Sequence, residues 1–182
     1  CYALLDDAST PGAGSRLYTG LAAVLRCDKG SEWPALLDGL QAALERGLHA
    51  VTVCSYELGA HLLAMPPRAP GEHAPPLAQV LLFEHCRHLS QDQVAQWLQA
   101  QAEASAGPAG IADISANIGQ AQFTQALNRI HDYIAAGDTY QVNYTYRLRF
   151  DAYGAPAALY ARLRARQPVP YGALLMLPDG GA

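Results

Sequence analysis

The sequence has little charge and no long apolar run. Only 15% of its 182 residues are charged, and the net charge is -4. Its longest apolar stretches, such as Val80 to Phe83 and Ala173 to Leu177, are far shorter than the roughly 20 residues of a membrane-spanning helix. Basic residues are scattered apart from two short clusters, 147–149 and 162–166. The sequence therefore predicts no membrane span and no nucleic-acid partner.

Zinc-type cysteine pairs, a secretion signal, a starting Met, a P-loop and a catalytic triad are also missing. The four cysteines stand far apart, which predicts reduced, buried thiols. On a strand, His85 and Cys86 of the cluster 84–88 would point to opposite faces, so no metal site is predicted there. Because the chain lacks a starting Met and ends straight after an apolar run, we expect a fragment of a longer protein. Because it opens without a secretion signal, we expect that protein to be cytoplasmic.

The first hundred residues alternate between strand and helix patterns. Strands are predicted at 2–5, 16–26, 49–56 and 77–85, the first two as a hairpin. Helices are predicted after Ser31 and after Ser90, where Gln93 completes the spacing of a capping box. The proline-rich segment 66–76 predicts an exposed loop. The pattern indicates an α+β protein whose helices cover a sheet.

The segment 120–150 has the clearest periodicity. Its first part predicts one helix face through Phe123, Leu127, Ile130 and Ile134, followed by a left-handed cap at Gly137. From Tyr140 to Phe150 the period changes to two, which predicts one long amphipathic strand. Its polar face meets solvent or lines a cavity, and solvent is the commoner case.

These residues resemble a motif of the chorismate-binding enzymes, the family that includes the large components of aminodeoxychorismate synthase and anthranilate synthase. The resemblance centres on 133–143 (YIAAGDTYQVN), where Gly137, Asp138, Tyr140, Gln141 and Asn143 are predicted to have structural roles. Segments 4–8 (LLDDA), 55–59 (SYELG) and 168–173 (PVPYGA) also resemble the family.

The resemblance implies an incomplete chorismate-binding fold, a β-sandwich with helices on its outer faces. Residues 1–106 would be the amino-terminal region, 107–118 a linker, and 119–182 the truncated beginning of the catalytic domain.

Within the family, Asn143 and the LLDDA segment favour the aminodeoxychorismate branch. The implied reaction is amination of chorismate to 4-amino-4-deoxychorismate for p-aminobenzoate and folate synthesis. Mg2+, a glutamine amidotransferase subunit and, in some relatives, a fused aminodeoxychorismate lyase domain would take part. The catalytic and metal-binding residues would lie beyond Ala182, so the fragment alone is expected to be inactive. Anthranilate synthase component I and a non-catalytic module that binds aromatic ligands remain alternatives.

The resemblance also implies an aromatic effector pocket formed by Asp6, Asp7, Pro170 and Tyr171. Tryptophan-inhibited relatives carry Glu-Ser at the position of the two aspartates, so feedback by tryptophan is not expected. Two plainer interpretations stay open: the aspartates begin a solvated turn, or Tyr171 is a core aromatic residue. His131 lies off the apolar helix face and is predicted to be a surface residue.

Overall fold

A computed structural model describes residues 1–10, 12, 14–66, 74–104 and 107–178. The chain divides into two compact units, Cys1–Ala100 with Tyr160–Ala182, and Gln101–Leu159. The two units are defined by contacts within the chain. They do not test the predicted domains, 1–106 and 119–182, which stay a prediction. Part of the predicted linker 107–118 forms a strand, Gly110–Ala116.

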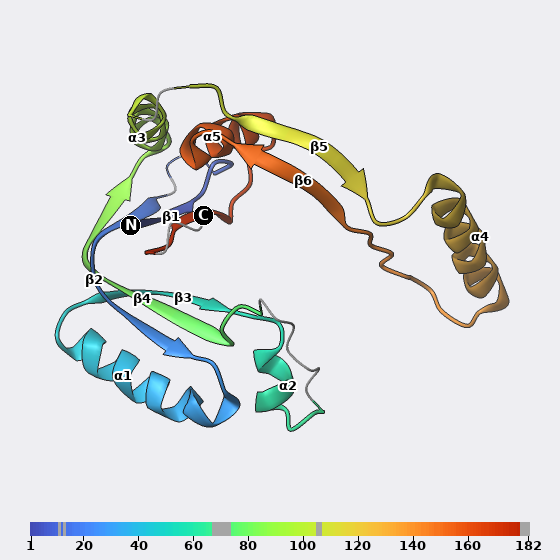
Figure 1. Cartoon of the computed structure of the whole chain (residues 1–182), viewed down its shortest axis with the longest axis horizontal. Helices are drawn as coiled ribbons and strands as arrows, with labels where there is room; N and C mark the ends of the chain where they lie inside the picture. The colour runs from blue at the N-terminus through green and yellow to red at the C-terminus, as the bar shows by residue number, and fades with distance from the viewer. Residues whose placement is uncertain (11, 13, 67–73, 105–106, 179–182) are drawn as a thin grey trace. The chain divides into compact units, whose positions relative to one another are not determined.

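The first unit is built on one antiparallel sheet (Figure 1). Its strands are β1 (Tyr2–Asp6), β2 (Ser15–Cys27), β3 (His49–Cys54), β4 (Ala78–Leu89) and β7 (Gly172–Met176). Their order in the sheet is β3-β4-β2-β1-β7. The predicted hairpin of β1 and β2 is confirmed. Strand β4 extends past the predicted end at residue 85 because its pairing with β2 continues as far as Leu89 and Ser15.

Four α-helices accompany this sheet: α1 (Trp33–Glu45), α2 (Leu58–Leu62), α3 (Gln91–Glu103) and α5 (Pro156–Arg166). A short 3-10 turn, Gly30–Glu32, precedes α1. The capping box of α3 is confirmed, since the Ser90 hydroxyl accepts from the Gln93 amide and the Gln93 side chain accepts from the Ser90 amide. Helix α2 was not predicted, because five residues are too few to show a helical period.

Alternating residues of β4 place apolar side chains in two clusters. Val80 and Leu82 pack in a cluster that includes Leu36 and Ala43 of α1. The next residues along the strand, Leu81 and Phe83, pack in a second cluster with residues of β1, β2 and β3. Because neighbouring strand residues point to opposite faces, both faces of β4 are buried along its first half, 78–83. The mixed α/β class is therefore as expected, with an antiparallel sheet and packed helices.

The second unit contains β5 (Gly110–Ala116), α4 (Gln120–Ala136) and β6 (Leu148–Tyr153). Strands β5 and β6 form a two-stranded antiparallel sheet. Helix α4 and its left-handed cap, Gly137 with φ of 82°, agree with the prediction. None of the residues of α4 or β6 is buried. The apolar face of α4 is therefore only partly covered, by contacts such as those of Phe123 with the rings of Tyr144 and Tyr146.

The long strand predicted from Tyr140 to Phe150 is wrong in its first part. Regular pairing begins only at Leu148, and 141–147 has no regular structure. A strand needs a neighbour that takes up its backbone hydrogen bonds, and sequence alternation does not supply one. Just before β6, the Arg147 amide donates a hydrogen bond to the side-chain oxygen of Asn117.

The predictions for the cysteines and for the proline-rich loop have different outcomes. The buried-thiol prediction holds for Cys27, whereas Cys1 and Cys54 are exposed and Cys86 is intermediate. All four cysteines are free. The predicted loop 66–76 lies mostly outside the described residues. Across the described part of the chain, no helix combines the length and the apolar character that crossing a membrane requires.

Candidate functional site

Antiparallel pairing of β1 with β7 brings the two ends of the predicted effector pocket together. In this ladder Asp6 pairs with Gly172. Pro170 and Tyr171 immediately precede Gly172 in the sequence. Beyond the last pair, the Ala8 amide donates to the Val169 carbonyl at 3.0 Å. Residues separated by more than 160 positions in sequence thus meet at one end of the strand pair.

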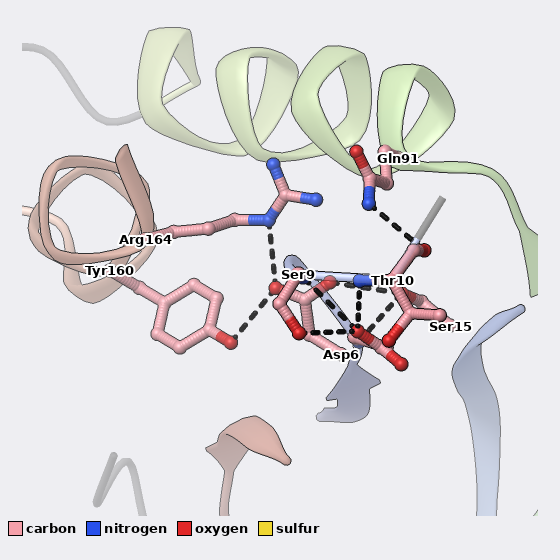
Figure 2. Close-up of polar contacts among 8 residues, drawn as sticks. Asp6, Ser9, Thr10, Ser15, Gln91, Tyr160 and Arg164 are labelled. Carbon is pink, nitrogen blue, oxygen red and sulfur yellow. Dashed lines mark hydrogen bonds and ion pairs between the residues drawn. The ribbon is translucent and has the colours of Figure 1, made fainter. Parts of the chain in front are cut away.

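The Asp6 carboxylate is buried in a network of three side-chain donors (Figure 2). Only 3% of Asp6 is exposed. Its Oδ1 accepts from the Ser15 hydroxyl at 2.9 Å. Its Oδ2 accepts from the Tyr160 hydroxyl at 3.1 Å and from Arg164 Nε at 2.8 Å. Because a buried carboxylate needs such partners, these bonds assign Asp6 to the scaffold of the site.

The two donors of α5, Tyr160 and Arg164, are partly buried. The Arg164 side chain is 16% exposed and forms the ion pair with Asp6. Its Nη2 is buried and has no hydrogen-bond acceptor among the described residues. Burial and the neighbouring Asp6 carboxylate raise the pKa of Tyr160 well above its ordinary value, so its hydroxyl keeps the proton that it donates.

Asp7 has a different role from Asp6. Its Oδ1 accepts from the amides of Thr10 at 2.9 Å and Ser9 at 3.1 Å, and from the Ser9 hydroxyl at 3.3 Å. These bonds, that from the Thr10 amide first, lower the pKa of Asp7 below its ordinary value. A further bond, from Gln91 of α3 to the Thr10 carbonyl, connects the turn to the start of this helix. The turn interpretation of Asp7 is confirmed, and a contact with a ligand stays a prediction.

Pro170 and Tyr171 lie at the surface. Tyr171 is 95% exposed, so its interpretation as a core residue is wrong. An exposed aromatic side chain beside the charged Asp7 turn can stack on a planar ligand. The segment therefore offers an accessible apolar surface next to a rigid polar scaffold.

Sequence reasoning missed four members of this site: Ser15, Tyr160, Arg164 and Gly172. A usable signal was the spacing of Tyr160 and Arg164, since residues four apart lie on one helix face. Their partner, however, lies on a strand about 150 residues earlier.

We expect Gly172→Ala to disconnect Tyr160 from Asp6. A Cβ at this position would overlap the Tyr160 hydroxyl, which has no room to stay on the carboxylate. The loss of that bond should lower the free energy of unfolding by about 1–2 kcal/mol, measured by urea denaturation. In a Tyr160→Phe background the cost should nearly vanish, because the ring Cζ would be 3.6 Å from the new Cβ, an ordinary contact. An equal cost in both backgrounds would contradict this explanation.

The family-motif residues lie in the second unit. Gly137 caps α4, and the Asp138 amide donates to the Tyr133 carbonyl. Tyr140 is 92% exposed, and Gln141 and Asn143 are exposed as well. His131 is exposed, as predicted. Among the described residues, Gly137 and Asp138 thus have structural roles at the end of α4, and the structural roles of Tyr140, Gln141 and Asn143 stay predictions.

A shallow pocket of about 450 Å³ in the first unit is lined by Gly12, Gly14 and 88–92. It contains none of the predicted effector residues. Among the residues that the structure describes, no group of three His, Cys, Asp or Glu side chains is placed to hold a metal ion.

Comparison with known proteins gives the family of the chain. The family model described as chorismate binding enzyme matches residues 2–182. Anthranilate synthase component 1 of Streptomyces coelicolor is 40% identical over 79 residues, 42% of this chain and 16% of the relative. Anthranilate synthase component 1 3 of Haloarcula marismortui is 33% identical over 92 residues, 50% of this chain and 18% of the relative.

An aminodeoxychorismate synthase component 1, that of Bacillus subtilis, is 42% identical over 57 residues, 31% of this chain and 12% of the relative. The matched part of the chain thus spans less than a fifth of each of these relatives. Since the family model covers essentially every residue, the chain belongs to the chorismate-binding enzyme family.

Proposed function

We propose that this chain is part of the large component of aminodeoxychorismate synthase, which aminates chorismate to 4-amino-4-deoxychorismate. The family match over residues 2–182 carries the proposal. The Bacillus subtilis relative with that name, the paired aspartates at 6 and 7, and Asn143 favour this branch. The product would supply p-aminobenzoate for folate synthesis in the cytoplasm.

The second candidate is anthranilate synthase component I. It is favoured by the matches to the Streptomyces coelicolor and Haloarcula marismortui relatives, which extend over more of this chain. Both candidates use chorismate, and they differ in the product that leaves.

The proposal includes Mg2+ and a glutamine amidotransferase subunit that supplies ammonia. It also includes a fused aminodeoxychorismate lyase domain as a further partner. The described residues do not fit a Mg2+ site, because a hard cation needs several converging oxygen ligands and none of their acidic groups converge in that way. We therefore place the proposed Mg2+ ligands beyond Ala182, and no step of the reaction is assigned to the described residues.

We assign the first unit a supporting role in the proposed enzyme, as one layer of a β-sandwich with an aromatic effector pocket at the end of β1 and β7. Asp7, Pro170 and Tyr171 are the proposed contact residues, since Tyr171 is exposed and Asp7 is held beside the same strand end. Asp6 holds this strand end in place through the hydrogen bonds that it accepts from Arg164 and Tyr160. A carboxylate at the Asp7 position, where tryptophan-inhibited relatives carry serine, argues against feedback by tryptophan.

The test is turnover by a polypeptide that includes this chain and continues beyond Ala182. Supplied with chorismate, Mg2+ and ammonia, it should form 4-amino-4-deoxychorismate, detected as p-aminobenzoate after addition of aminodeoxychorismate lyase. Chromatography of the same mixture would reveal anthranilate and pyruvate. The 182-residue chain alone serves as the control and should form neither product.

Each outcome decides between the candidates. Release of anthranilate and pyruvate would assign the protein to the second candidate. No turnover, together with saturable binding of an aromatic amino acid measured by calorimetry, would support the non-catalytic module and overturn both enzyme assignments.

A further inference from the structure

We draw no further inference here: the strongest candidate, the buried Nη2 of Arg164 in the side-chain cluster around Asp6 at the end of β1 and β7, belongs to the site already described, where the Asp6 carboxylate already holds the same guanidinium.

Discussion

Replacing Arg164 by Met should destabilise the first unit by about 3 kcal/mol, because it leaves the Asp6 carboxylate buried without its cation. The Asp6 side chain is 1% exposed, and Arg164 Nε lies 2.8 Å from its Oδ2. Ser15 and Tyr160 would remain as donors, but neither carries a positive charge. Urea denaturation followed by circular dichroism measures the loss.

Two further variants show whether the buried charge is the cause. Arg166→Met removes an exposed arginine from the same helix and should change the free energy of unfolding by less than about 0.5 kcal/mol. Asp6→Asn should be destabilising in the unmodified chain but should recover stability in the Arg164→Met background, where it removes the uncompensated charge. If Asp6→Asn is destabilising by the same amount in both backgrounds, the ion pair is not what connects α5 to β1.

In the second unit, Gly154→Ala should cost about 3 kcal/mol or more in local stability. Gly154 has φ of 80°, where a side chain is strained. A Cβ here would also overlap the Pro108 carbonyl oxygen and lie 2.5 Å from the Ala109 Cα, and backbone atoms cannot move aside as a side chain can. Hydrogen exchange of the β5 and β6 amides measures the effect, since the substitution should separate the ends of these strands.

Gly137→Ala is the matched control. Gly137 has nearly the same φ, 82°, but a Cβ there would meet nothing within 4 Å. Its substitution should therefore carry the backbone strain alone, about 1–2 kcal/mol. Equal protection losses in the two variants would show that the contact with Pro108 and Ala109 does not matter.

Features that depend on neighbours in sequence were predicted well. The apolar period of 120–136, the left-handed Gly137 and the Ser90–Gln93 capping box all appear where expected. Each involves residues within a few positions of one another, so the sequence contains both halves of the interaction. The family resemblance noted in the sequence has the same basis, since it centres on the short run 133–143.

Features that depend on distant partners were not predicted. The alternation from Tyr140 onward is present, but strand pairing reaches back only to Leu148. Likewise, the sequence did not distinguish Asp6 from Asp7, which are adjacent and chemically identical. The structure buries Asp6 against Tyr160 and Arg164 and leaves Asp7 in a turn.

By itself, the sequence determined the local helices, caps and turns and the family to which the chain belongs. Short-range hydrogen bonds and apolar periodicity depend on residues that are close together in the sequence. Only the tertiary structure decided that Asp6 is scaffold, that Tyr171 is exposed and that β6 pairs with β5. Those properties depend on which segments meet across the fold. Asp6, for example, is held by Tyr160 and Arg164, which lie about 150 residues later, and no local pattern encodes those partners.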